Sequence, residues 1–131
     1  MAIRQIAVVS TLEILTCKSL DISLEEKAWK PVGVTETFTS SDQTIGVFAE
    51  IQNVYNGASY QFRLYKPDGT FVYETDKETF DWGDYPPCVK APSFVYYPIH
   101  TTVFGNASPG QWKVEVYADG QKAGEVYFEY K

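Results

Sequence analysis

The feature that most constrains this chain is the alternation of apolar and polar residues near its C-terminal end. In the stretch QWKVEVYADGQKAGEVYFEYK, residues 111–131, apolar side chains recur at every second position on both sides of an Asp-Gly pair. A period of two is that of a β-strand with one buried face, and Asp-Gly is typical of a tight hairpin turn. The stretch therefore predicts an antiparallel hairpin. The residues expected to share its buried face are Trp112, Val114, Val116, Val126 and Phe128.

The length of the turn decides the register of this hairpin. A two-residue turn at 119–120 would place Val114 opposite Glu125 and mix apolar with acidic side chains on one face. A three-residue loop at 118–120 places Val114 opposite Gly124 and keeps each face uniform. We therefore predict the three-residue loop.

Alternation of the same kind extends along most of the chain, with short turn signals between the runs. Strands are expected near residues 3–9, 12–22, 34–39, 45–54, 58–66, 70–75, 94–104, 112–118 and 123–130. Only SLEEKAW, residues 23–29, has helical composition, and it is too short for more than a turn or two before Pro31. The chain is thus predicted to be a single domain, residues 1–131, folded as an all-β antiparallel β-sandwich of seven to nine strands.

A second hairpin is expected around YKPDGTF. Pro67 presets the first turn position and Gly69 can take the positive φ that the turn requires. Just upstream, residues 45–51 alternate in the same way. We therefore expect residues 45–75 to form a meander of three strands.

The charge and composition restrict the classes of partner. The formal net charge is −6, from 17 acidic and 11 basic residues, so the chain repels phosphate backbones and nucleic acid is not expected as a partner. No apolar run approaches the roughly 20 residues that span a bilayer, so we expect a soluble acidic protein without membrane insertion. Residues 1–17 are interpreted as a strand rather than a signal peptide, because Glu13 interrupts the apolar run.

Catalytic and cofactor motifs are sparse. The single histidine, His100, lies in a strand-like segment, and no phosphate-binding or dinucleotide-binding motif occurs. Asp76 and Glu78 could add oxygen ligands to Asp81 and Asp84, but their spacing differs from that of a calcium loop. The sequence therefore predicts a protein that is not an enzyme and that needs no cofactor or metal.

The two cysteines, Cys17 and Cys88, allow two interpretations. A bridge between them would close a long loop and stabilise the fold by roughly 4 kcal/mol, which would place the protein in an oxidising compartment. Alternatively they are two separate buried thiols. The sequence leaves both open.

The segment FDWGDYPPCVKAPSFVYY, residues 80–97, is the candidate recognition loop. Its prolines predict a stiff extended stretch over residues 84–93 that cannot pair in the centre of a sheet. Flat rings beside carboxylates suit a sugar-binding face, whereas aromatic residues are more often part of a core. The candidate ligand-binding residues are Trp82, Tyr85, Asp81, Asp84 and Tyr97.

The stretch SPGQWKVEVYADGQKAGEVYFEY, residues 108–130, resembles the last two strands of immunoglobulin-like β-sandwich domains in bacterial and archaeal surface proteins. The positions of Cys17 and Cys88 depart from the antibody pattern, in which a cysteine pair flanks a core tryptophan. The resemblance implies a binding, adhesive or spacer role with a protein or a glycan as partner, and an extracellular or cell-envelope location. Carbohydrate binding through residues 80–97 is the alternative.

Overall fold

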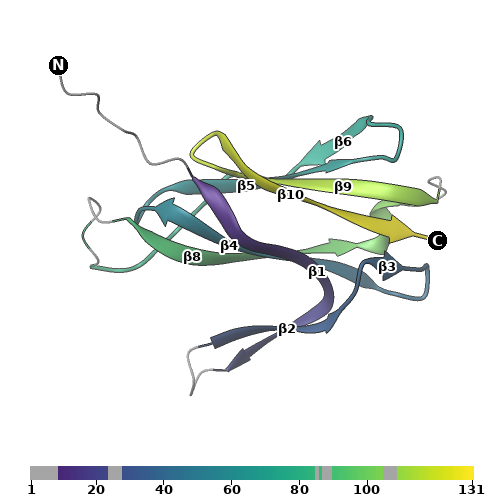
Figure 1. Ribbon diagram of the computed structural model, residues 1–131, viewed down its shortest axis with the longest axis horizontal. Helices are drawn as coiled ribbons and strands as arrows, with labels where there is room; N and C mark the ends of the chain where they lie inside the picture. The colour runs from purple at the N-terminus through teal and green to yellow at the C-terminus, as the bar shows by residue number, and fades with distance from the viewer. Residues whose placement is uncertain (1–8, 24–27, 85, 87–89, 105–108) are drawn as a thin grey trace.

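The computed structural model describes residues 9–23, 28–84, 86, 90–104 and 109–131 (Figure 1). These residues form two stacked, mostly antiparallel sheets and contain no α-helix. The fold is an all-β sandwich, as predicted. Among the described residues there are ten strands: eight have four or more residues, within the predicted range, and two have only two residues each. The strand expected near residues 3–9 lies almost entirely outside the described part.

The lower sheet in Figure 1 has the order β2-β1-β4-β8 and the upper sheet the order β3-β10-β9-β5-β6. In the lower sheet the strands are β1 (Ser10–Ser23), β2 (Ala28–Val34), β4 (Thr44–Val54) and β8 (Ala91–His100). In the upper sheet they are β3 (Thr37–Phe38), β5 (Ser59–Tyr65), β6 (Phe71–Glu74), β9 (Gly110–Ala118) and β10 (Gln121–Tyr130). The short β7 (Glu78–Thr79) pairs with β5, and β3 pairs with β10 in parallel. A 3-10 turn, Thr101–Val103, follows β8.

The core lies between the two sheets and is built from alternate residues of the facing strands. From β4 these are Ile45, Val47, Ala49 and Ile51. From β9 and β10 they are Trp112, Val114, Val116 and Phe128, all of them predicted for this face. Val126, the fifth residue predicted there, is half-buried and packs against the core.

The predicted register of the β9–β10 hairpin is wrong. Ala118 pairs with Gln121, so Asp119 and Gly120 form a two-residue turn, in which both have positive φ (51° and 75°). A bulge at Ala123 then adds one residue to β10 and brings apolar residues opposite one another again, with Val126 opposite Val114 and Phe128 opposite Trp112. The bulge removes the mismatch that had argued against the short turn.

Strand β1 connects the two sheets at the front of the sandwich. It lies in the lower sheet and passes close to β10 of the upper one (Figure 1). Gly124 of β10 leaves the space that this approach needs, because a Cβ there would clash with the side chain of Thr11. The first described strand is thus packed directly on the last.

The β5–β6 hairpin is confirmed, but the three-strand meander over residues 45–75 is wrong. Gly69 has a φ of 89°, and its N–H donates to the Lys66 carbonyl at 2.9 Å. Strand β4 pairs with β1 and β8 in the lower sheet, whereas β5 belongs to the upper sheet. The chain therefore crosses between the sheets after Val54 instead of turning back within one.

The helical turn expected at residues 23–29 is also wrong for the described residues of this segment, which belong to strands. Strand β1 continues to Ser23 and β2 begins at Ala28, and the two strands pair antiparallel. Residues 24–27 lie outside the described part. The ring of Trp29 stacks on Phe94 of β8 with centroids 6.3 Å apart, so a tertiary contact favours the strand over the helical propensity of the segment.

Strand β8 forms one edge of the lower sheet, and this position explains its prolines. Pro92 and Pro98 lie within β8, where each lacks the N–H that a central strand would use. Its odd-numbered residues Val95, Tyr97 and Ile99 pair with the inward-facing residues of β4, whereas Phe94 and Tyr96 lie on the outer face. An edge strand of this kind leaves one side of the sandwich open beside β8.

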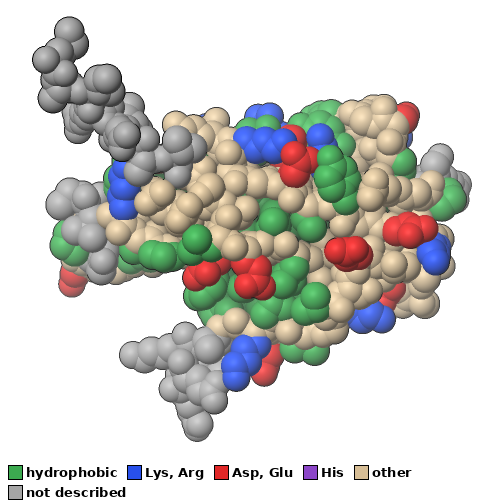
Figure 2. Space-filling model, in the orientation of Figure 1, with side chains coloured by type: hydrophobic (Ala, Val, Ile, Leu, Met, Phe, Trp, Pro, Cys, Tyr) green, Lys and Arg blue, Asp and Glu red, His purple; other side chains and the backbone are tan. Residues whose placement is uncertain are grey.

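The outer face of the upper sheet carries an ion-pair network. Figure 2 shows acidic and basic side chains mixed on the surface of this sheet. At its centre is Glu115 of β9, whose side chain is only 8% exposed. The carboxylate lies 2.9 Å from Lys122 Nζ and 3.5 Å from Lys113 Nζ, and it accepts a hydrogen bond from Tyr117 Oη at 3.0 Å. Lys122 is held a second time by Glu125 at 2.8 Å.

Candidate functional site

Two neighbouring hollows lie along the open side of the sandwich. The first, which we name the Tyr97 cavity, has a volume of about 370 Å³ and lies between β8 and the strands β5, β6 and β7. The second, the Trp82 hollow, has a volume of about 220 Å³. Tyr60 lines both, so the two hollows meet at its ring. The larger volume falls within the usual range of sites for small ligands.

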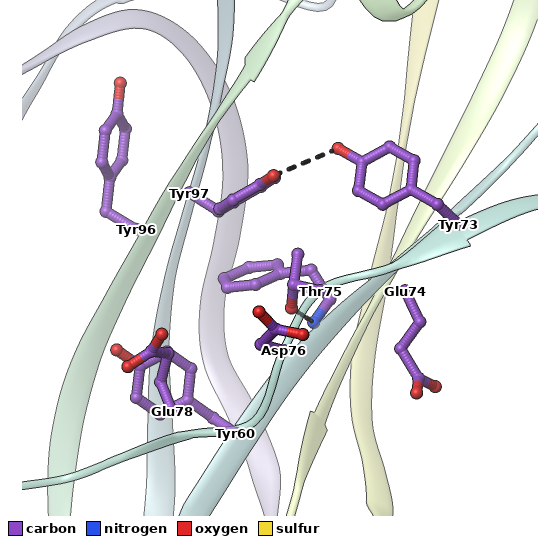
Figure 3. A pocket seen from close by; sticks show the side chains of 9 residues that line it. Tyr60, Tyr73, Glu74, Thr75, Asp76, Glu78, Tyr96 and Tyr97 are labelled. Atoms are coloured by element: carbon purple, nitrogen blue, oxygen red, sulfur yellow. Dashed lines mark hydrogen bonds between the residues drawn. The ribbon is translucent and has the colours of Figure 1, made fainter.

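Aromatic rings from three strands form the wall of the Tyr97 cavity (Figure 3). Tyr97 of β8 stacks on Phe62 of β5, with ring centroids 5.5 Å apart and an interplanar angle of 24°. Tyr60 meets Phe62 edge-on at 6.4 Å. Tyr73 of β6 completes the wall from the other side. Tyr60, Tyr73 and Tyr97 are all half-buried, so each ring keeps a part that is open to solvent.

Two tyrosine hydroxyls in this wall, those of Tyr60 and Tyr73, are held in their neutral form. Tyr73 donates a hydrogen bond to Tyr97 across the cavity, with the two oxygens 3.4 Å apart. Burial raises the pKa of Tyr73, and the contact with Tyr97 raises it further. Burial also raises the pKa of Tyr60, and the negative charge of Glu78 adds to this effect. The hydroxyls of Tyr60 and Tyr73 are therefore donors and acceptors without charge at neutral pH.

Two carboxylates flank the mouth of the cavity. After β6 ends at Glu74, Thr75 stays bonded to β5 through its N–H and Oγ1, and β7 then places Glu78 opposite Tyr60. Asp76 and Glu78 both line the cavity and both are exposed. Within the described residues, neither carboxylate has a hydrogen bond or an ion pair. Their negative charge is therefore available to a ligand.

The Trp82 hollow is lined by rings from both sheets. Trp29 of β2 is 37% exposed and Phe94 of β8 is 41% exposed. Phe94 also stacks on Phe48 at 5.6 Å, which extends the aromatic layer over the outer face of the lower sheet. Trp82 enters from the loop after β7 and is half-buried against Phe80, with centroids 6.1 Å apart.

The side chain of Asn56 positions the Trp82 loop. Its Oδ1 accepts a hydrogen bond from the Trp82 N–H at 2.8 Å, and its Nδ2 donates to the Gly83 carbonyl at 3.0 Å. The Trp82 indole N–H donates to Ser93 Oγ at 3.3 Å. Asp81 Oδ1 accepts from the Gly83 N–H at 3.0 Å, so this carboxylate stabilises the turn while it lines the hollow. The local sequence signal for Asn56 was only its place in an Asn-Gly turn.

The structure separates the predicted site residues. Trp82 and Asp81 line the Trp82 hollow, whereas Tyr97 lies in the Tyr97 cavity. Asp84 is exposed and lines neither. Tyr85 lies outside the described residues. Tyr60 and Tyr73 line the cavity but had no local motif, because their strands reach β8 only through the stacking of the two sheets.

The cysteine and histidine predictions concern other parts of the molecule. Cys17 of β1 is fully buried on the outer side of the lower sheet, and burial raises the pKa of its thiol. Cys17 is a free thiol in the structure, which favours two separate thiols over a bridge to Cys88. Cys88 itself lies outside the described residues. His100 is exposed at the end of β8. In the described part, no group of three or more His, Cys, Asp or Glu side chains is placed to hold a metal ion.

The comparisons with known proteins bear on the fold. No protein-family model matches the chain. No curated protein matches it in sequence. Among solved structures, the chain is similar to the alkylpurine DNA glycosylase AlkC of Pseudomonas fluorescens bound to DNA containing an abasic site analog. The TM-score is 0.54 at 11% identity, over 94% of this chain and 30% of that one.

Two further structures are similar at lower scores. An immunoglobulin-like protein from Pseudomonas aeruginosa has a TM-score of 0.48 at 12% identity, over 95% of this chain and 98% of that one. A β-glucosidase from Listeria innocua in complex with isofagomine has a TM-score of 0.48 at 15% identity, over 90% of this chain and 16% of that one. This chain thus spans less than a third of the glycosylase and about a sixth of the glucosidase.

At these identities the likenesses show the fold alone. The two stacked sheets and their strand order form an immunoglobulin-like β-sandwich, and the similarity to the glycosylase structure is at the level of this fold alone. No helix among the described residues is long and apolar enough to span a membrane. Function must then be argued from the sites, because this architecture supports many unrelated activities.

Proposed function

We propose that this chain is a non-enzymatic binding module that holds its ligand in the Tyr97 cavity. The observation that supports the proposal most directly is that half-exposed rings and two carboxylates, which have no ion pair among the described residues, surround one open cavity. Rings offer apolar contact area at a low cost in conformational entropy, and carboxylates accept hydrogen bonds and attract cations. Nucleic acid is not the expected partner, because both the cavity mouth and the whole chain are acidic.

The strands around the cavity suit a recognition role. The wall is built on β5, β6 and β8, so its rings are held by sheet pairing and by the core beneath them. Tyr97 rests on the buried Phe62, which fixes the orientation of its ring before any ligand arrives. A preformed site loses little entropy when it binds. A protein partner presenting a side chain to this cavity is the occupant that we favour.

Carbohydrate recognition at the Trp82 hollow is the second proposal. It is supported by the partly exposed rings of Trp29 and Phe94 beside Trp82, with the carboxylate of Asp81 at the same hollow. Sugar rings stack on such faces while their hydroxyls donate to a carboxylate. Because Tyr60 joins the two hollows, a longer ligand could occupy both.

Both proposals can be tested by NMR titration of the isotope-labelled protein. Neutral oligosaccharides and short peptides of varied charge are added in turn, and the amide shifts of Tyr60, Glu78 and Tyr97 are followed. The main proposal expects saturable shifts at these residues. Ligands that bind only elsewhere, or no binding at all, would contradict it.

Two variants and an activity assay sharpen the test. Trp29→Ala should weaken saccharide binding at the Trp82 hollow strongly and lower the melting temperature only slightly, because Trp29 is partly exposed and stacks only at the surface on Phe94. Phe71→Ala is the matched control, since Phe71 is 51% exposed and lines neither hollow. Release of product from chromogenic glycosides that disappears in Asp76→Asn would refute the non-enzymatic assignment.

A further inference from the structure

The charges around the Tyr97 cavity all have one sign. Among the described residues, its lining includes Glu74, Asp76 and Glu78 but no Lys, Arg or His. Figure 3 shows Glu74 directed away from the rings, and its carboxylate accepts hydrogen bonds from Arg63 and from Gln61 on the outer face. Asp76 and Glu78 lie at the mouth, in front of the rings.

These two carboxylates have no counter-charge of their own. Neither has an ion pair or a hydrogen bond within the described residues. Lys77 stands between them in the sequence, but it is exposed and does not line the cavity. By contrast, Glu115 on the upper sheet is paired with two lysines. Asp76 and Glu78 therefore differ from Glu115, and from Glu74 of the same cavity, whose charges are matched by lysines and by Arg63.

The rings behind the carboxylates also favour positive charge. The face of an aromatic ring carries negative electrostatic potential, which attracts an ammonium or guanidinium group within about 6 Å. Tyr60, Tyr73 and Tyr97 surround the cavity, and the raised pKa values of Tyr60 and Tyr73 keep their hydroxyls neutral at physiological pH. An anion would be repelled at the mouth and would find no basic donor inside. A neutral ligand would leave the two carboxylates without a partner.

We propose that the Tyr97 cavity binds an organic cation, the guanidinium group of an arginine side chain presented by a partner protein. This inference rests on the proposed function of the cavity. Guanidinium is planar and weakly hydrated, so it can lie against a ring while its N–H groups donate to a carboxylate. A lysine ammonium holds its water more tightly and gains less from ring contact. The site therefore favours arginine over lysine.

The experiment compares matched ligands that differ only in charge. N-acetyl-arginine methylamide is titrated into the labelled protein beside its neutral isostere, N-acetyl-citrulline methylamide, and beside the lysine analogue. Two more ligands, free arginine and an alanine pentapeptide with one central arginine, are titrated in the same way. Their comparison shows whether the guanidinium group that binds belongs to a free amino acid or to a protein segment. We expect saturable shifts at Tyr60, Glu78 and Tyr97, with the arginine analogue binding at least about fivefold more tightly than the citrulline analogue. The pentapeptide should bind at least as well as free arginine.

A pair of double variants tests the role of the carboxylates. Asp76→Asn with Glu78→Gln should weaken binding of the arginine analogue by about tenfold and leave the melting temperature unchanged, because both side chains are exposed. The matched control is Asp21→Asn with Glu13→Gln on β1. These are also one exposed Asp and one exposed Glu, and neither lines the cavity. The control should lose no more than about twofold. Because both carboxylates are exposed, raising the salt concentration to 1 M should weaken binding clearly more in the wild type than in the neutralised variant.

The outcomes separate the two proposals. Equal binding of the arginine and citrulline analogues at the cavity would refute the cation inference and leave the binding module intact. Equal losses in both double variants would mean that net charge, and not this cavity, attracts the ligand, which also refutes the inference. Amide shift changes at Tyr60, Glu78 and Tyr97 that occur with saccharides but not with the arginine ligands would also refute the cation inference. If no ligand shifts Tyr60, Glu78 and Tyr97, both proposals fail.

Discussion

Replacing Glu115 by Gln removes one negative charge from the centre of the network on the upper sheet while keeping the size of the side chain. Burial acts to raise the pKa of Glu115, but hydrogen bonds from Lys122, Tyr65 and Tyr117 outweigh it and lower the pKa from 4.5 to about 2. Lys122 keeps its second partner, Glu125, after the substitution. The cost is therefore mainly the loss of the charged interactions of Glu115 itself.

The size and the pH dependence of this loss follow from the lowered pKa. A tenfold change in proton affinity corresponds to about 1.4 kcal/mol, so lowering the pKa from 4.5 to about 2 corresponds to roughly 3 kcal/mol at neutral pH. The lysines are partly exposed and solvent screens them, so we expect a loss of about 1 to 3 kcal/mol. A lowered carboxyl pKa stabilises the fold fully above pH 4.5, and this stability is lost as the pH falls toward 2.

Urea denaturation followed by tryptophan fluorescence measures the difference between the two proteins. At pH 7 the free energy of unfolding of Glu115→Gln should be lower than that of the wild type by the amount above. By pH 3 the difference should shrink to about half. Glu129→Gln, at an exposed residue of the same sheet, is the control and should change stability by less than about 0.5 kcal/mol. A difference at Glu115 that is below 0.5 kcal/mol at pH 7, or that stays constant down to pH 3, would refute the reasoning.

Three further substitutions test the packing of the fold. Trp112→Ala should cost about 3 to 5 kcal/mol in urea denaturation, because the side chain is fully buried between the sheets; a loss below 1 kcal/mol would contradict its place in the core. Gly46→Ala should lower stability by about 1 to 3 kcal/mol, since the new Cβ would lie 2.6 Å from the Tyr96 hydroxyl, and Tyr96→Leu in the same chain should restore part of the loss. Asp119→Ala should cost about 1 to 2 kcal/mol in the free energy of unfolding. It removes the carboxylate that accepts the Ser59 N–H at 3.1 Å, and alanine at this positive φ has no side-chain hydrogen bond to offset the backbone strain. An unchanged melting temperature would contradict this prediction.

The β9–β10 hairpin shows how far local pattern could predict the fold. The spacing of Trp112, Val114 and Phe128 was enough to assign them to one face of the sheet. Side chains alternate between the two faces, so a register shift of two residues leaves each of them on the face that was predicted. The register itself depended on a bulge at Ala123, for which the alternation offers no local signal. The order of β4 and β5 was missed for a similar reason. Alternation marks a strand but does not say which sheet it joins.

The same limit applies to the site. Trp82 and Asp81 are close in sequence, so composition alone could place them together, and they do share a hollow. The Tyr97 cavity joins β8 to β5 and β6 across the two sheets, and no sequence spacing connects Tyr97 with Tyr60 or Tyr73. Trp29 was assigned to a short helical segment because its packing on Phe94 is a long-range contact. Sites formed between sheets become visible only in the folded chain.

The packing of β1 on β10 has a consequence for the kinetics of folding. Thr11 and Gly124 stand near opposite ends of the described chain, and β3 pairs with β10 over a similar separation. Such contacts form only after the long intervening chain has been ordered, because the entropy of loop closure opposes them. The hairpins β5–β6 and β9–β10 need no such closure. We therefore expect these hairpins and the β1–β2 pair to form early and the contact of β1 with β10 to form last, with refolding in milliseconds to seconds rather than microseconds. During synthesis, this contact would form only after β10 has left the ribosome.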